Sequence, residues 1–345
     1  MRTVILSASD IVNIIRAAGR DAIMDEMVDR LSEGFRSLGE GRFIPSPPRS
    51  GFVRESNGVG VLEWMPHHDP GSSATIKVVG YTPANAATSA LPTIIGTISR
   101  YDDATGRLTA LADAVVLTAL RTGAASAVAS RLLARRDSRV VGLIGTGAQA
   151  VSQLHALSRS FDIERVIVHD VDPDNADSFI IRSKFLGLDV RIAPPEEIAA
   201  HADIICTATT TEVGADPVFC DVDMLAHVHV NAVGADLPGK TELPVGLLRR
   251  ALVCPDHLEQ ARKEGECQRL APQEIGPDLA ALAARPELAE AARDTPTVFD
   301  STGVAVEDHI AFDVLLGFAD RLGLGTPIDV EYHPGDALNP YPDEA

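Results

Sequence analysis

Short apolar runs alternate with helical patterns between about residue 138 and residue 305, and this alternation constrains the fold more than any other feature. Continuous apolar runs are typical of strands buried on both faces. Strands that alternate with helices build βαβ units, in which the strands run parallel. The pattern therefore predicts an α/β fold with an open parallel sheet. Its strands would be the runs 139–144, 165–169, 190–192, 203–207 and 229–233, with shorter ones at 252–254 and 297–299.

The first run leads into a glycine-rich loop, G-T-G-A-Q-A at 145–150, and a helical pattern follows through about residue 157. A Rossmann dinucleotide-binding loop requires this setting of strand, loop and helix. Gly145 permits the tight turn, Gly147 lets the backbone approach a pyrophosphate, and Ala150 is small enough for helix–strand packing. Free N–H groups at the helix N-terminus would bind the phosphates.

Asp170, at the end of the second run, supports this interpretation. An acidic group there accepts hydrogen bonds from the adenosine ribose hydroxyls and repels a 2′-phosphate, which favours NAD over NADP. The alternative is a glycine turn followed by a surface aspartate. Even a true Rossmann fold does not specify a reaction, so other residues must indicate the chemistry.

The flanking stretches predict a second region of mixed α+β structure. Strands are expected at 3–6, 59–65, 74–80, 93–99 and 108–111. Helices are expected at 117–133, at 308–322, and from caps at Ser9 and Asp10 to about residue 38, where Gly39 and Gly41 would end the helix. The charged, Ala-rich stretch 257–294 predicts surface helix, and the tail 332–340 predicts loop. We expect a Rossmann NAD-binding domain over 131–307 and a second domain over 1–130 plus 308–345.

Composition and charge exclude several classes of partner. The formal net charge of −19 argues against binding to the phosphate backbone of nucleic acid. No apolar stretch reaches the length of about 18 residues typical of a transmembrane helix, so we expect a cytoplasmic protein without a membrane partner. The four cysteines lack zinc-site spacing, and Cys206 is expected to be inert core packing. His227 and His229 are interpreted as core or surface histidines, so no metal is expected.

Three cations are candidates for holding a small carboxylate. Arg121 lies among apolar residues of a helical stretch, and a lone arginine in a core is rarely left unpaired. A guanidinium can pair with a carboxylate through two parallel hydrogen bonds. Lys77 and Arg49 are the other two candidates. Lys77 would otherwise be a solvated strand lysine, and Arg49 lies in a loosely patterned, proline-rich stretch.

Asp236 is a candidate acid/base group. It follows the run 229–233 and lies in a Gly–Pro turn. Ligands of α/β folds bind at the carboxyl ends of the parallel strands, where this carboxylate is expected. The alternative is an aspartate that caps the following turn.

Six segments between about residues 40 and 310 contain long specific strings. They are LEWMP at 62–66, IKV at 76–78, LRTGAAS at 120–126, the glycine loop, NAVGADLPGKTEL at 231–243 and FDSTG at 299–303. In this order they resemble the ornithine cyclodeaminase and mu-crystallin family. Within it, the stretches 120–135 and 142–157 and the tail YHPGDALNPY look like the lysine cyclodeaminases of actinobacterial antibiotic pathways.

The resemblance implies an NAD-binding Rossmann domain and a second domain that holds substrate and forms a homodimer. It implies that Asp236 is the acid/base group and that Glu63 contacts the reacting amine or a water. It also implies a substrate site at Arg49, Lys77, Arg121 and Met65. The implied cofactor contacts are Thr122, Gly145, Thr146, Gly147, Ala148, Gln149, Asp170, Thr207, Val233, Gly234, Ala235, Lys240 and Ser301. Glu264 and Glu266 receive no role.

The activity implied by the resemblance is cyclising deamination of a basic amino acid. The substrate's α-carbon would give a hydride to NAD⁺, the side-chain amine would close the ring, ammonia would leave, and the hydride would return. Lysine, giving L-pipecolate, is the preferred substrate, and ornithine, giving L-proline, is the runner-up. An amino-acid or ketimine oxidoreductase and a ligand-binding protein of the crystallin type are the competing interpretations. The presence of Asp236 together with Glu63, Lys77 and Arg121 favours catalysis.

Overall fold

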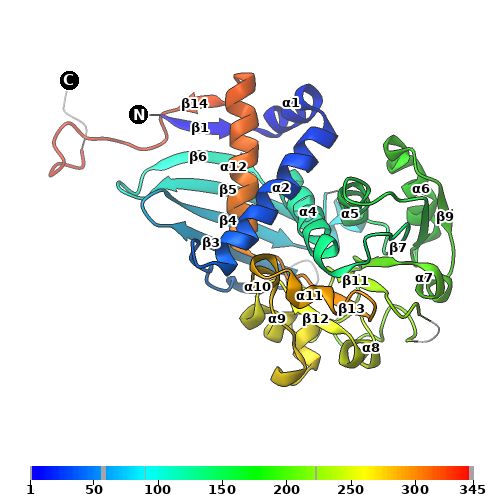
Figure 1. Ribbon diagram of the computed structural model, residues 1–345. Coiled ribbons are helices and arrows are strands. Elements are labelled where there is room, and N and C mark those ends of the chain that lie inside the picture. The colour runs from blue at the N-terminus through cyan, green and yellow to red at the C-terminus, as the bar shows by residue number, and fades with distance from the viewer. Residues whose placement is uncertain (1, 56–59, 90, 222–223, 342–345) are drawn as a thin grey trace.

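The computed structural model describes residues 2–55, 60–89, 91–221 and 224–341. These residues form two seven-stranded sheets, one mixed and one parallel. In Figure 1 the long helices α2 and α12 cross the near side of the mixed sheet, and the parallel sheet with its helices lies to the right. The α/β class and the parallel sheet predicted from the sequence are confirmed.

The mixed sheet has the strand order β14-β1-β6-β5-β4-β3-β2. β1 is parallel to β6, and the other neighbours are antiparallel. The strands β2 and β14 were not expected, and residue 59 of the expected strand 59–65 lies outside the described residues. The bounds are β1 Thr3–Leu6, β2 Ser50–Arg54, β3 Gly60–Asp69, β4 Ser73–Tyr81, β5 Ile94–Asp102, β6 Leu108–Asp113 and β14 Thr326–Ile328.

The strand β4 shows how this sheet positions polar side chains. Alternate residues of a strand point to opposite faces. Thr75, Lys77 and Val79 are buried, whereas Ile76 and Val78 between them are more exposed. The buried face meets helix α12 (Ala305–Leu322), where Thr75 Oγ1 lies 2.8 Å from His309 Nδ1. Lys77 is thereby held inside the protein.

The long N-terminal helix predicted from the sequence is wrong, because the structure has two helices, α1 (Ala8–Ala18) and α2 (Arg20–Gly39). Gly19 separates them with φ +87°, a backbone conformation that glycine adopts without steric cost. Ser7, rather than Ser9, is the N-cap of α1 and forms a capping box with Asp10.

Helices α2, α4 (Val115–Leu133) and α12 share one hydrophobic core on the buried face of the mixed sheet. The helices expected at 117–133 and 308–322 are thereby confirmed. Helix α4 also packs against α5 (Ala148–Ser158) of the parallel half. It therefore connects the two sheets, as Figure 1 shows.

The parallel sheet has the order β12-β13-β11-β10-β7-β8-β9. The order reverses between β7 and β10, which is the switch point where such sheets bind ligands. Its strands are β7 Val140–Ile144, β8 Arg165–His169, β9 Val190–Ile192, β10 Ile204–Thr207, β11 His229–Ala232, β12 Leu252–Pro255 and β13 Thr297–Asp300. The remaining helices before residue 257 are α3 Asn85–Thr88, α6 Pro173–Arg182, η1 Lys184–Leu186, α7 Pro195–His201 and α8 Val245–Arg250.

The prediction of surface helix over 257–294 is wrong. The segment forms five short helices, and part of it is buried. Leu279 and Leu282 enter the core beside α2, and Glu264 and Glu266 are almost inaccessible to solvent. The charged composition is misleading because these two carboxylates have polar partners inside the protein. The helices are α9 Leu258–Glu264, η2 Glu266–Arg269, η3 Pro272–Glu274, α10 Leu279–Ala284 and α11 Glu287–Glu290.

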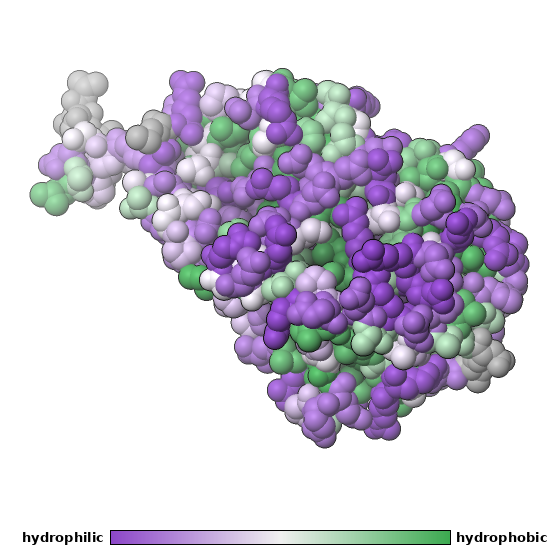
Figure 2. Space-filling view, in the orientation of Figure 1, coloured by the Kyte–Doolittle hydropathy of each residue, from purple (hydrophilic) through white to green (hydrophobic). Residues whose placement is uncertain are grey.

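Hydrophilic side chains dominate the face of the molecule drawn in Figure 2, with small apolar patches between them. Residues 332–340 form a loop, as predicted, and project from the body in Figure 1. Among the described residues, no helix has the length and apolar character needed to cross a membrane. The two expected domain ranges stay a prediction.

We predict that Gly123→Ala destabilises the protein. Helix α4 approaches α5 so closely at Gly123 that a Cβ atom would lie 2.7 Å from the carbonyl carbon of Ser152. Overpacking against backbone costs about 1–3 kcal/mol, which we expect as a loss in the free energy of unfolding in urea. Gly317→Ala in α12 is the control, because its Cβ would meet only Arg321 Nη1 at 3.6 Å. Equal stability of the two variants would contradict the close approach.

Candidate active site

The glycine loop has the geometry that a dinucleotide requires. Gly145 has φ +87°, and a Cβ there would lie 2.6 Å from the carbonyl oxygen of Ala208. Gly147 is the N-cap of α5, and the space where its Cβ would stand is open. No side chain caps this helix end, so its first N–H groups can bind phosphate. A cavity opens here, lined by Gly147, Ala148, Gln149, Thr209, Val233 and Gly234 among others.

Asp170 holds the glycine loop from the end of β8. Its Oδ2 accepts hydrogen bonds from the backbone N–H of Thr146 at 2.7 Å and from Thr146 Oγ1 at 2.9 Å. Its Oδ1 accepts from the N–H of Asp172 at 3.0 Å. Partial burial would raise the pKa of Asp170, but these hydrogen bonds outweigh it and lower the pKa. An ionised carboxylate beside the loop fits the ribose-binding role, which stays a prediction.

A second cavity collects the candidate catalytic and substrate residues. All six of them line it, although they come from five separate parts of the chain. Thr122, Gln149, Val233 and Ser301 from the expected cofactor contacts line it too. Gly145, Thr146, Asp170, Thr207 and Ala235 line neither cavity. The six are Arg49, Glu63, Met65, Lys77, Arg121 and Asp236.

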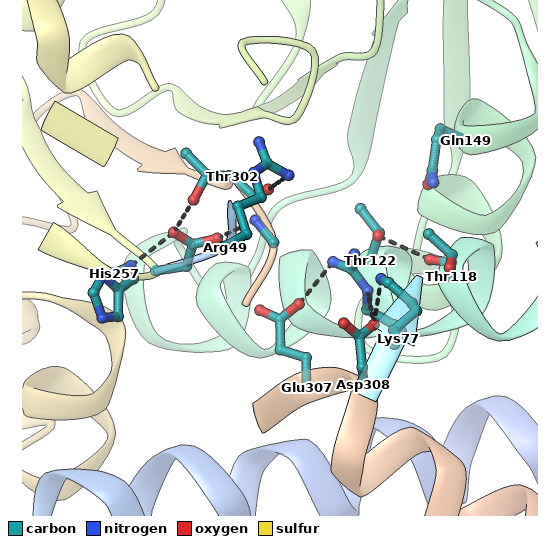
Figure 3. Close-up of polar contacts among 12 residues, drawn as sticks. Arg49, Lys77, Thr118, Thr122, Gln149, His257, Thr302, Glu307 and Asp308 are labelled. Carbon is teal, nitrogen blue, oxygen red and sulfur yellow. Dashed lines mark hydrogen bonds and ion pairs between the residues drawn. The ribbon is translucent and has the colours of Figure 1, made fainter. Parts of the chain in front are cut away.

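Lys77 and Arg121 are held by two carboxylates that the sequence analysis missed. Lys77 Nζ donates to Asp308 Oδ1 at 2.7 Å, and Arg121 Nε donates to the same oxygen at 3.0 Å. Arg121 Nη1 donates to Glu307 Oε2 at 2.8 Å. In Figure 3, Glu307 and Asp308 rise from α12 toward Lys77, whereas Arg49 lies on the other side beside Thr302. A buried arginine needs such partners. The sequence feature that could have identified them is the Glu-Asp pair near the start of the last apolar helix.

Burial sets the protonation of this cluster. It lowers the pKa of Lys77 to about 8, an effect that the positive charge of Arg121 increases and Asp308 opposes. Burial raises the pKa of Glu307 to about 8, against the opposing effect of Arg121. Glu307 Oε1 and Asp308 Oδ2 are buried and have no hydrogen-bond partner among the described residues. The cluster can therefore change protonation near neutral pH.

Arg49 bridges the two halves of the protein. Its Nη2 donates to the carbonyl oxygen of Asp236 at 2.9 Å, and its Nη1 donates to that of Thr302 at 3.1 Å. Its Nε lies 2.6 Å from Glu264 Oε1 and 3.5 Å from Glu63 Oε1. Burial raises the pKa of Glu63, and the positive charge of Arg49 opposes this. Glu264 is a third residue that the sequence analysis missed, because it lies in a stretch interpreted as surface.

Asp236 pairs with Lys240 one turn further along the chain. Lys240 Nζ donates to Asp236 Oδ1 at 2.9 Å and lies 5.2 Å from the centre of the Tyr81 ring. Burial raises the pKa of the Tyr81 hydroxyl, and Lys240 opposes this. Lys240 was expected to contact the cofactor, and here it positions the candidate acid/base group.

Glu242 holds the loops at the switch point together through hydrogen bonds. Its Oε2 accepts from Thr207 Oγ1 at 2.6 Å and from the N–H of Gly234 at 2.8 Å. Its Oε1 accepts from the N–H and Oγ1 of Thr209. The carboxylate is completely buried. It therefore joins the ends of β10 and β11, and the hydroxyl of Thr207 faces Glu242.

The side chains that were expected to be inert are buried or paired with neighbouring polar groups. His229 is buried between Thr297 and Asn231, and His227 contacts Asp203. Cys206 is buried, which raises the pKa of its thiol to about 12. All four cysteines are free. The described residues contain no group of three or more potential metal ligands.

A glycine loop at a parallel-sheet switch point, beside a cavity with paired cations and a carboxylate, defines a Rossmann protein of the dinucleotide-dependent class. The chain belongs to the ornithine cyclodeaminase/mu-crystallin family, whose model matches residues 9–316. It is 49% identical over 341 residues to an L-lysine cyclodeaminase from Streptomyces rapamycinicus, covering 99% of each chain.

Solved structures agree with this assignment. A lysine cyclodeaminase structure, described as showing recognition of L-lysine, L-ornithine and L-2,4-diaminobutyric acid, is 55% identical with a TM-score of 0.97 and 99% coverage of both chains. An archaeal alanine dehydrogenase dimer with bound NAD is 32% identical with a TM-score of 0.86. It covers 96% of this chain and 100% of that one.

We predict that Glu307→Gln flattens the pH dependence of stability. A glutamate with a raised pKa binds its proton more strongly in the folded protein than in the unfolded chain, where its pKa is about 4.3. The stability that Glu307 contributes is therefore complete below about pH 4 and is lost as the pH rises toward 8. Between pH 5 and pH 8 we expect the free energy of unfolding to fall about 1–3 kcal/mol less in the variant than in the wild type.

Urea unfolding at a series of pH values measures this slope. Glu259→Gln is the matched control, because Glu259 is exposed and pairs only with Lys263 on the same helix. Parallel pH profiles for Glu307→Gln and the wild type would show that Glu307 is ionised throughout the range.

Proposed function

We propose that the protein is an L-lysine cyclodeaminase that converts L-lysine to L-pipecolate and ammonia and recycles its NAD internally. The observation that carries this proposal is the cavity that combines Asp236 and Glu63 with Lys77 and Arg121 next to the glycine loop. The full-length similarity to an L-lysine cyclodeaminase supports the choice of substrate.

NAD fits the residues present. The open space at Gly147 and the uncapped start of α5 suit the pyrophosphate, and Asp170 suits an unphosphorylated ribose. Gln149 and Val233 line both cavities and would face the cofactor where these meet, and Thr122 and Ser301 would approach it from the second cavity. When bound, NAD supplies a hydride acceptor for the substrate's α-carbon and later returns the hydride, so no external reductant is consumed.

The substrate's α-carboxylate would bind at Lys77 and Arg121. Their pairing with Glu307 and Asp308 holds both cations in fixed positions before substrate arrives. Preorganisation of this kind reduces the ordering cost of binding. Arg49 faces the same cavity from the opposite side, where Glu63 and Glu264 flank its guanidinium.

Asp236 would transfer the protons of ring closure. The side-chain nitrogen must lose a proton before it attacks the oxidised α-carbon, and the α-nitrogen must gain one before ammonia leaves. Lys240 occupies Oδ1 of Asp236, which leaves Oδ2 for both transfers. Glu63, also in this cavity, would orient the amine. Met65, Val79 and Ile94 give the cavity an apolar wall that limits hydrolysis of the intermediate.

The deciding experiment is a product assay with L-lysine and L-ornithine in parallel and a catalytic amount of NAD⁺. Ammonia and pipecolate from lysine, without accumulation of NADH, would support the proposal. Proline from ornithine alone would change the assigned substrate from lysine to ornithine. The two substrates differ by one methylene, which changes the binding energy by only about 1–3 kcal/mol. Stoichiometric NADH would favour the second candidate, an amino-acid oxidoreductase, to which the alanine dehydrogenase similarity points.

We predict that Asp236→Asn lowers kcat by about 10²–10⁴-fold, because general acid–base catalysis contributes an effect of this size. NAD affinity, measured by protein fluorescence quenching, should change little, because the glycine loop is intact. Asp216→Asn is the control, since Asp216 is exposed and borders neither cavity. Unchanged turnover in the Asp236→Asn variant would contradict the assignment of Asp236 as the acid/base group.

We also propose a homodimer formed through the outer face of the mixed sheet. Phe52, Trp64, Val78 and Ile95 are exposed on the neighbouring strands β2, β3, β4 and β5. The Phe52 and Trp64 rings contact each other edge to face. An exposed apolar sheet face of this kind marks an interaction surface, and a related structure is a dimer.

We also propose a cytoplasmic location. Four free cysteines are compatible with a reducing, cytoplasmic location.

We predict that Val78→Glu dissociates this dimer, because an unpaired charge buried in an interface costs about 3–5 kcal/mol. Light scattering coupled to size-exclusion chromatography measures the mass. Ile192→Glu is a matched control, because Ile192 is 39% exposed, close to the 38% of Val78, but lies in the edge strand of the parallel sheet. A dimeric Val78→Glu protein would refute this interface.

A further inference from the structure

Glu264 is the last residue of α9 and extends from the parallel half toward the candidate active site. Gln260, one turn earlier on the same helix, accepts from the N–H of Arg49 and donates to Thr302 Oγ1 and the carbonyl oxygen of Gly303. Helix α9 therefore presents two side chains to the loop residues around the cavity. Glu264 does not line the cavity itself and reaches it through Arg49.

At this end of the cavity, negative groups outnumber positive ones. Glu264 and Glu63 flank Arg49 Nε at 2.6 Å and 3.5 Å, and Asp236 is paired with Lys240. Three carboxylates thus share two cations. At the other end, Lys77 and Arg121 face Glu307 and Asp308, and the raised pKa of Glu307 leaves that cluster without a surplus of negative charge. The surplus negative charge is located at the Arg49 end.

The titration of Glu264 is consistent with this surplus. Burial raises its pKa to about 7, and the negative charges of Glu63 and Asp236 add to the effect. Arg49 opposes the shift without cancelling it. A further positive charge brought into the cavity would interact favourably with all three carboxylates.

We propose that Glu264 is a positioning and specificity-determining residue, which holds Arg49 and supplies the surplus negative charge that selects amino acids with a second ammonium group. This inference rests on the proposed function and identifies what would distinguish a diamino acid from a neutral one. Without Glu264, Arg49 would lose its nearest counter-charge and keep Glu63 at 3.5 Å, so the positive charge of its guanidinium would repel the second ammonium more strongly.

The test compares L-lysine with L-norleucine, which lacks the ε-amino group, in the NAD-loaded enzyme. We expect Glu264→Gln to raise the KM for lysine about 10-fold, the effect of removing one unit charge roughly 10 Å away at an effective dielectric constant of about 20. The inhibition constant of norleucine should change less than about 2-fold, because norleucine has no second charge. Glu264→Asp, which keeps the negative charge, should restore most of the selectivity.

Glu259→Gln is the control on the same helix, where an exposed glutamate pairs with Lys263. It should leave both constants unchanged. If Glu264→Gln does not fold, Glu264→Ser removes the same charge and leaves room for water, and the same comparison decides. Equal weakening of lysine and norleucine binding would show that Glu264 has only a structural role, which would contradict the proposal. Unchanged affinity for both ligands would also refute it.

The result is independent of whether lysine is cyclised. Equilibrium dialysis of lysine and norleucine against the wild type and variants loaded with NADH, which cannot accept a hydride from the substrate, measures selectivity without turnover. Loss of lysine preference in Glu264→Gln would support the proposal even if the product assay gave no pipecolate. Absence of any lysine preference in the wild-type protein would contradict it.

Discussion

The buried cluster of Lys77, Arg121, Glu307 and Asp308 is the interaction on which the site depends. Each of the four side chains is 6% exposed or less, so none of the charges is solvated by water. Removing one partner from such a cluster would leave an uncompensated buried charge, which is strongly destabilising. Because the four groups belong to β4, α4 and α12, their mutual dependence fixes the sheet and both helices around the cavity.

The parallel half supplies the other wall of the cavity, and hydrogen bonds to a buried carboxylate hold that wall. Glu242 gathers the ends of β10 and β11 from behind, and Asp236 follows directly in the loop that Glu242 holds. Arg49 then links this loop to the mixed-sheet half through two carbonyl oxygens. Buried carboxylates thus position the backbone, and one guanidinium joins the halves. The catalytic geometry is a property of both halves together.

Local patterns were sufficient for much of this arrangement. The glycine loop and Asp170 could be placed from sequence because strand, turn and helix are adjacent in the chain. Gly19 also marked a break, but the apolar periodicity on both sides of it favoured one helix. Strand β2 is mostly exposed and has no alternating pattern, so nothing in residues 50–54 indicated it. Glu264, Glu307 and Asp308 become functional candidates only when distant segments meet, as Lys77 and Asp308 do across 231 positions.

The division of charge along the cavity explains how one fold can serve different amino acids. On the proposed function, the end at Lys77 and Arg121 would bind a group common to every amino acid, and carboxylates of α12 hold its two cations. The side chain in which substrates differ would then lie at the Arg49 end, where the surplus of carboxylates comes from α9 and β3 rather than from the glycine loop. Substitutions at that end can change which side chain is accepted without disturbing the buried cluster or the cofactor loop. Specificity and scaffold are therefore separable here because they depend on different ion pairs.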